Sequence, residues 1–143
     1  MTQTIAPTLA PAGTAAACTI LTLPEPVDDS GEIDYDLALH LDAEDLAEQG
    51  ILSAYQQLAP RLTEYGLTAG TVTVNDDSPA NLYSVDFDGH LYAVYGPNVA
   101  VEDAWGLATH ALFDIVNLQL ASTGIRFYAI NGRNDLFGMA VST

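Results

Sequence analysis

The chain has 143 residues, 49% of them hydrophobic and 15% charged, and its 19 Asp and Glu against 3 Lys and Arg give a net charge of −16. This length fits one domain with a sizeable core, and so apolar a composition excludes an intrinsically disordered chain. The negative field repels phosphate backbones and anionic lipids, which excludes nucleic acid and membrane surfaces as partners and favours a basic protein.

The N-terminal residues predict a tail. Residues 1–15 are rich in Thr, Ala and Pro and are expected to form a flexible tail before a single domain over residues 16–143. The tail lacks the basic start and continuous apolar core of a signal peptide, and Cys18 is the only cysteine, so it has no partner for an internal disulfide. No run approaches the ~20 apolar residues that span a bilayer. We therefore expect a cytoplasmic protein.

Two strands are predicted before the first helix. Residues 17–23 form a β-rich run that ends at Pro24. Residues 33–41 alternate with period two, so one face is expected in the core and the other in water. The apolar face consists of Ile33, Tyr35, Leu37, Leu39 and Leu41, and the water-facing side carries the carboxylates of Asp34, Asp36 and Asp42.

The pattern then becomes helical. Asp42 is a suitable N-cap, and an apolar stripe at spacings of three and four residues continues until Gly66. Pro60 is expected to kink or divide this helix. A second helix is predicted over residues 101–120.

Five further strands are predicted around the second helix, over residues 71–75, 82–87, 90–95, 125–130 and 136–141. Asp88-Gly89 and Asn131-Gly132 are the pairs that type I′ hairpin turns favour. The order ββ-α-βββ-α-ββ predicts an α+β fold, a mainly antiparallel sheet with two helices packed on one face. The residues expected in its core are Tyr35, Leu37, Leu39, Ile51, Leu58, Tyr92, Trp105, Leu112, Ile115 and Phe127.

No motif of catalysis or metal binding is found. The chain has no P-loop, GxSxG or GxGxxG sequence, and its three histidines are isolated from any zinc-ligand pattern. The segment PVDDSGEIDYDL resembles a calcium-binding loop, but Pro26 and Leu37 occupy two of the decisive ligand positions. We expect a non-enzymatic protein without metal or cofactor.

The acidic residues are concentrated in one segment. Ten of the 19 lie between Glu25 and Glu48, 24 positions without Lys or Arg. Such a surface steers a basic protein into contact. The residues predicted to bind this partner are Asp28, Asp29, Glu32, Asp34 and Asp36. The alternative is a solvated strand face whose acidity serves only solubility.

Arg133, one of three basic residues, lies in the stretch RFYAINGRNDLFGMAVS, residues 126–142. Turn chemistry explains most of NGRND, and an ion pair between Arg133 and Asp135 would contribute about 0 to 1 kcal/mol. A contact role for this tip stays open, so Arg133 is included among the partner-binding candidates.

The same stretch, with its aromatic strand, N-G-x-N-D turn and hydrophobic final strand, resembles the C-terminal hairpin of small acidic α+β immunity proteins that neutralise bacterial polymorphic toxins. The resemblance covers about a third of the chain. It implies a compact, non-enzymatic protein dedicated to one toxin, and it transfers no site residues. The other hypothesis is a structural or ligand-binding module, with a homodimer joined through an unpaired strand edge.

Overall fold

The computed structural model describes residues 23–77 and 79–142, in which the strands form two antiparallel sheets of three strands each. One has the order β1–β6–β5, formed by Leu39–His40, Phe137–Ser142 and Ile125–Ile130. The other has the order β2–β3–β4, formed by Thr73–Asp77, Leu82–Phe87 and His90–Tyr95. The two long helices are α2, Ile51–Glu64, and α3, Ala104–Leu120. The predicted α+β class with antiparallel strands is confirmed.

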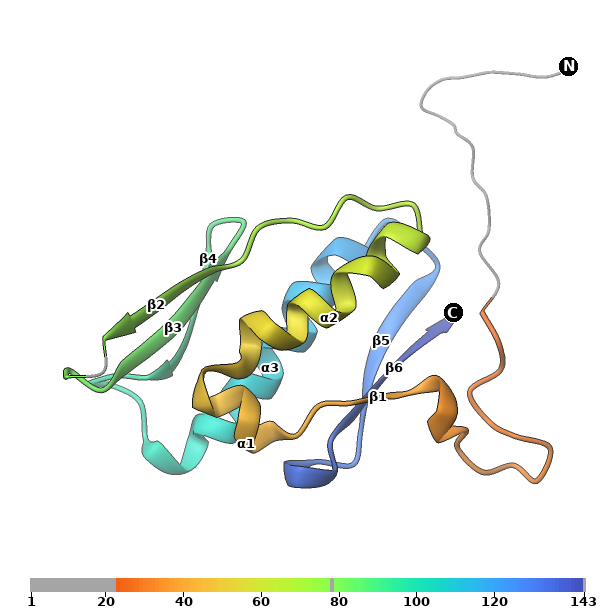
Figure 1. Ribbon diagram of the computed structural model, residues 1–143, viewed down its shortest axis with the longest axis horizontal. Coiled ribbons are helices and arrows are strands. Elements are labelled where there is room, and N and C mark those ends of the chain that lie inside the picture. Colours follow the sequence, from red (N-terminus) through yellow and green to blue (C-terminus); the bar gives the residue numbers. More distant parts are fainter. Residues whose placement is uncertain (1–22, 78, 143) are drawn as a thin grey trace, which may run out of the picture.

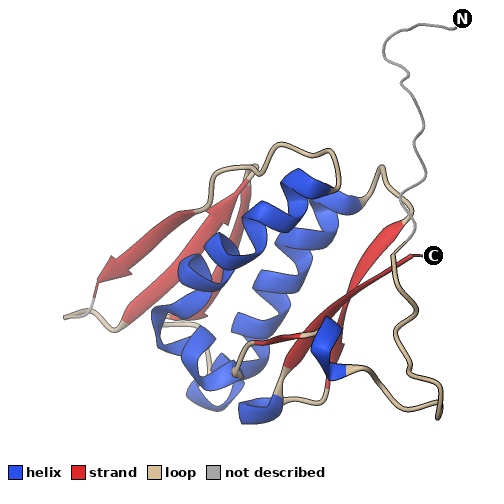
Figure 2. Ribbon diagram, turned by 45° about the vertical axis from the view of Figure 1, so that its right-hand side comes forward, coloured by secondary structure: helices blue, strands red, loops and turns tan. Residues whose placement is uncertain are grey.

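The helices lie between the two sheets, as Figure 1 and Figure 2 show from two directions. α3 contacts β4 of one sheet and β5 of the other. Its buried residues accordingly form a broad stripe: Ala104, Ala108, Ala111, Leu112, Phe113, Ile115, Val116 and Leu120. A helix with so broad an apolar side is suited to a place between two layers. Each sheet has helices on one face, as predicted, but the order of elements did not indicate two sheets.

The segment before the first helix differs from its prediction. The strand expected over residues 33–41 is wrong, because Tyr35–Leu37 form a 3-10 turn, η1, and only Leu39–His40 pair with β6. The carboxylate of Asp34 accepts a hydrogen bond from the backbone N–H of Asp36 at 3.1 Å. This local cap closes a turn where the alternating pattern required an extended backbone.

Because the strand expected over residues 33–41 does not form, its apolar side chains do not all enter the core. Ile33 and Tyr35 are exposed, and Leu37 and Leu39 are half-buried, whereas Leu41 is buried. The tail predicted over residues 1–15, Cys18 and the strand predicted over residues 17–23, apart from Leu23, lie outside the described residues.

The first helical region is interrupted well before Pro60. It begins with α1, Ala43–Asp45, and continues through a π turn, η2, Leu46–Gly50, into α2. The break occurs at Glu48 and Gln49, whose φ of 73° is left-handed, while α2 runs without interruption through Pro60. A Cβ at Gly50 would lie 2.3 Å from the carbonyl oxygen of Asp45. The turn therefore requires glycine there, a constraint that side-chain periodicity did not reveal.

The two hairpins differ in how well their turns were predicted. Asp88 and Gly89 have φ of 49° and 80°, as a type I′ turn between β3 and β4 requires. Asn131-Gly132 is not such a pair, because Gly132 is extended, with φ of −170°. The chain instead forms a wider loop that includes the 3-10 turn η4, Arg133–Asp135, and β5 meets β6 at the pair of Ile130 and Phe137.

The core agrees with the prediction at five positions of α2, α3 and β5. Buried as expected are Ile51, Leu58, Leu112, Ile115 and Phe127. Tyr92 and Trp105 are half-buried and pack against this core.

Candidate functional site

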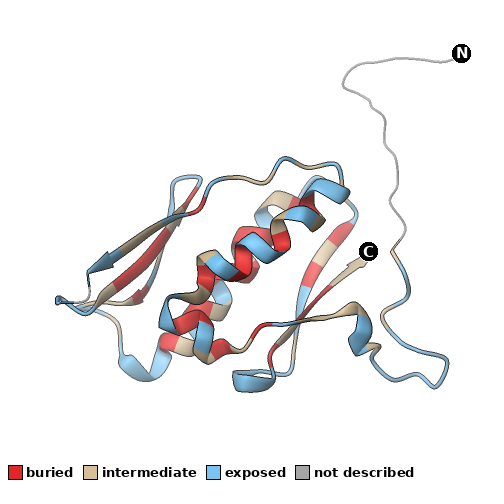
Figure 3. Cartoon of the chain, viewed as in Figure 1, coloured by how far each residue is buried: buried red, intermediate tan, exposed pale blue. Residues whose placement is uncertain are grey.

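The acidic hairpin, residues 27–36, carries five of the six residues predicted to bind a partner, and it is almost continuously exposed (Figure 3). Its ends are joined by an antiparallel bridge between Val27 and Ile33. The Oδ1 of Asp28 accepts hydrogen bonds from the N–H and hydroxyl of Ser30, at 2.9 and 2.6 Å, and from the N–H of Glu32 at 3.1 Å. These bonds hold the loop in one conformation.

The same bonds affect the chemistry of Asp28. The hydroxyl of Ser30, followed by the backbone N–H of Glu32, lowers the pKa of the Asp28 carboxyl below its ordinary value. Asp28 therefore remains charged while it organises the turn. Asp34 has the corresponding role in the next turn, where it caps η1. Asp29 and Asp36 cap neither of these turns, and both residues are exposed.

The carboxylates of the acidic hairpin are interspersed with exposed apolar side chains. Val27, Ile33 and Tyr35 are 44%, 38% and 45% exposed. Sequence reasoning missed this feature, because alternation over residues 33–41 predicted that Ile33 and Tyr35 enter the core. The prediction that Asp34, Asp36 and Asp42 share one strand face is also wrong, since two of them cap separate helical turns.

Tyr35 attaches the acidic hairpin to the rest of the protein. Its ring packs edge-on against Phe137 of β6, with 4.9 Å between centroids. Its hydroxyl accepts a hydrogen bond from the Asn131 amide at 3.2 Å. The hairpin is thereby brought against the β5–β6 loop, which is 96 residues away in the sequence.

Two of the acidic residues that follow the hairpin, Asp42 and Glu44, have structural partners. The side-chain amide of Asn134 donates to Asp42 Oδ1 and Glu44 Oε1, both at 3.1 Å. His40 Nε2 lies 2.8 Å from the carbonyl oxygen of Asn134 and must donate to it, because a carbonyl only accepts. Asp42 also caps α1 by accepting from the N–H of Glu44. These carboxylates hold the β5–β6 loop in place.

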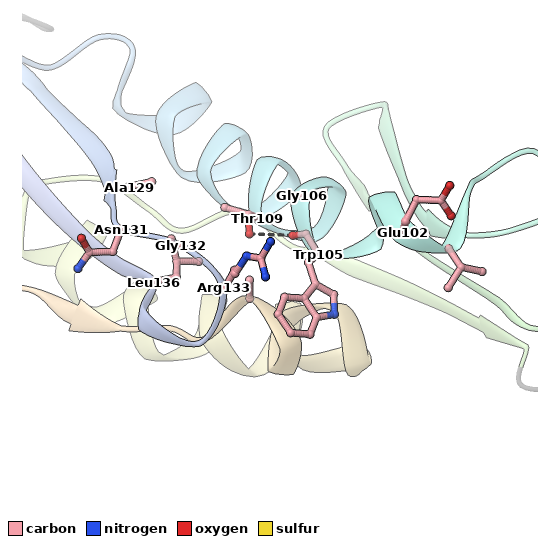
Figure 4. A pocket seen from close by; sticks show the side chains of 11 residues that line it. Glu102, Trp105, Gly106, Thr109, Ala129, Asn131, Gly132, Arg133 and Leu136 are labelled. Carbon is pink, nitrogen blue, oxygen red and sulfur yellow. Dashed lines mark hydrogen bonds between the residues drawn. The ribbon is translucent and has the colours of Figure 1, made fainter.

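Arg133 does not join the acidic residues. Among the described residues its guanidinium forms no hydrogen bond or ion pair, so the ion pair expected with Asp135 is absent. Arg133 lines a groove of about 620 Å³ between the β5–β6 loop and the first turns of α3, which also includes Trp105 and Thr109 (Figure 4). The structure thus separates Arg133 from the other partner-binding candidates.

A second polar cluster lies where β4 meets α3. The hydroxyl of Tyr92 donates to Asp114 Oδ2 at 2.5 Å, and the rings of His90 and His110 lie 6.4 and 6.2 Å from the ring of Tyr92. Burial, followed by the hydrogen bond and charge of Asp114, raises the pKa of Tyr92 far above its usual range. Tyr92 therefore stays a neutral donor, which suits it to a structural role.

Residues 23–77 and 79–142 contain no cluster of three or more His, Cys, Asp or Glu placed to hold a metal ion. None of the helices in these residues has the length and apolar character needed to cross a membrane. Comparisons with protein-family models, with curated proteins and with solved structures gave no match to this chain.

Proposed function

We propose that this protein is a non-enzymatic binding module whose acidic hairpin docks onto a basic protein. The observation that supports the proposal is the mixture of exposed Val27, Ile33 and Tyr35 with carboxylates on one protruding segment. Binding surfaces combine apolar anchors, which supply most of the affinity, with a charged rim that guides encounter. A solvated acidic face needs no apolar anchors.

The resemblance of residues 126–142 to immunity proteins makes a bacterial toxin domain the partner class. Toxin domains that bind nucleic acid carry the positive surface that such an acidic hairpin complements. In this proposal Asp29, Glu32 and Asp36 attract the toxin, Asp28 and Asp34 hold the loop in its binding shape, and Tyr35 connects it to the β5–β6 loop.

The test compares two charge reversals that change the net charge equally. Asp36→Lys alters the acidic hairpin, whereas Asp103→Lys alters an exposed residue immediately before α3, on the side of β4. The full-length protein and both variants are used to capture partners from the native host, and the association rate of the captured protein is measured at several salt concentrations. We expect a basic partner whose association slows with salt and with Asp36→Lys, but much less with Asp103→Lys.

A separate variant tests the apolar anchor. Ile33→Ser should accelerate dissociation, because it removes buried apolar contact from the complex without changing the charge of the hairpin. The proposal fails if the captured protein is acidic, if both charge reversals slow association equally, or if Ile33→Ser dissociates at the wild-type rate.

A further inference from the structure

The lining of the groove between α3 and the β5–β6 loop includes none of the residues of the acidic hairpin and differs from it chemically. Its walls include the indole of Trp105 with Ala43, Ala129 and Leu136, and its volume of about 620 Å³ lies within the range of small-molecule sites. Figure 4 shows the Arg133 side chain reaching across this space toward α3. The groove therefore has apolar walls beside polar ones, with Arg133 as its one cation.

The backbone around Arg133 has an unusual conformation. Arg133 has φ of 56° and Asn131 has φ of 61°, both in the left-handed region that non-glycine residues rarely occupy. The loop is held by two tethers, from the Asn131 amide to the Tyr35 hydroxyl and from the Asn134 amide to Asp42 and Glu44. Such strain persists where surrounding contacts impose it, and here it directs a cation into the groove.

The groove contains a positive charge, that of Arg133, in a strongly acidic protein. With 19 acidic and 3 basic residues, a cation has many possible carboxylate partners, yet the Arg133 guanidinium has none among the described residues. Glu102, the acidic residue of the groove, lies beyond Trp105 with its carboxylate turned away from Arg133 (Figure 4). An unpaired guanidinium presents a planar set of donors that matches a carboxylate.

We propose that this groove binds a small organic monocarboxylate, with its carboxylate on Arg133 and its apolar body against Trp105 and Ala129. A net charge of −16 opposes anions in proportion to their charge, so a single carboxylate is favoured over phosphate or a nucleotide. The apolar walls require an apolar body, since a purely polar acid would leave the indole in contact with water.

Octanoate is a suitable probe, and octanamide is its uncharged counterpart with the same apolar body. Trp105 is the only tryptophan, so its fluorescence reports on the groove without a label. We expect octanoate to change the Trp105 emission saturably in the full-length protein. Arg133→Gln should weaken this binding about tenfold or more, as removal of a charge-assisted hydrogen bond does, and octanamide should bind as weakly to the wild type.

Arg61→Gln is the matched control, because it removes the same charge from α2, outside the groove. It should leave the octanoate affinity close to that of the wild type. The thermal unfolding of Arg133→Gln should also match the wild type, since the exposed Arg133 side chain makes no internal bond. The proposal is overturned if octanoate gives no saturable change, if octanamide binds equally well, or if both arginine variants weaken binding alike.

Discussion

At the scale of single residues, two glycines differ in whether their surroundings leave room for a side chain. A Cβ at Gly138 would lie 2.1 Å from Cζ of Phe127, whose buried ring stacks on Phe113 with 4.8 Å between centroids. A Cβ at Gly132 would meet no atom within 4 Å, and its φ of −170° is open to any residue. Two glycines six positions apart thus have different roles.

This contrast predicts the effect of adding one methyl group. Gly138→Ala should lower the free energy of unfolding by about 1–3 kcal/mol, because the Phe127 ring must move within a packed core. Gly132→Ala should change it by less than about 0.5 kcal/mol. Denaturant unfolding of both variants measures the difference, and equal midpoints would mean that Phe127 does not cover Gly138.

At the scale of elements, Asn117 joins α3 to the free edge of β5. Its amide nitrogen donates to the Phe127 carbonyl at 2.9 Å, and its amide oxygen accepts from the Phe127 N–H at 2.8 Å. Among the described residues β5 is an edge strand in the order β1–β6–β5, so within residues 23–77 and 79–142 these backbone groups have no neighbouring strand on that side. The side chain replaces a strand there and keeps the edge from pairing with another chain.

Removal of the Asn117 side chain should reduce the stability of the fold and loosen the backbone at Phe127. Asn117→Ala should lower the free energy of unfolding by about 1–3 kcal/mol, because two backbone groups lose their partner. The amide proton of Phe127 should also exchange faster with solvent. Leu118→Ala, at an exposed position of α3, is the control and should have little effect on either measurement. Unchanged exchange at Phe127 in Asn117→Ala would show that this amide is protected by other means.

At the scale of the whole molecule, alkaline pH tests how the tyrosines are held. The three basic residues are all arginines, so tyrosine side chains dominate the titration near pH 10. Burial is the main cause that raises the pKa values of Tyr65, Tyr83 and Tyr92 in the folded protein. Their neutral forms stabilise the fold below the unfolded pKa of about 10, and this contribution is lost as the pH rises through the folded pKa values.

The free energy of unfolding should therefore decrease steeply above about pH 10. Tyr92→Phe should reduce this slope, because one of the shifted groups is gone. Asp114→Asn should reduce it partly, since an amide still accepts the Tyr92 hydrogen bond but carries no charge. Denaturant titrations between neutral and alkaline pH measure the slope, and an identical slope in wild type and Tyr92→Phe would contradict the assigned role of the pair.

The sequence by itself determined the elements whose signals are local. Long periodic runs identified α3 and most of α2, and turn chemistry located the hairpin at Asp88-Gly89. β3, β4 and β5 were predicted with the bounds that they have in the structure. The negative charge and the acidic segment are likewise properties of composition, because they need no knowledge of folding.

The tertiary structure decided the rest, since it depends on contacts between distant residues. Alternation at residues 33–41 predicted a half-buried strand, but the Asp34 cap closes a turn there and leaves Ile33 and Tyr35 exposed, with Leu37 and Leu39 half-buried. The groove around Arg133 and Trp105 exists only because α3 lies beside the β5–β6 loop. Periodicity identifies which side chains are apolar, whereas only the packing of layers decides which of them are covered.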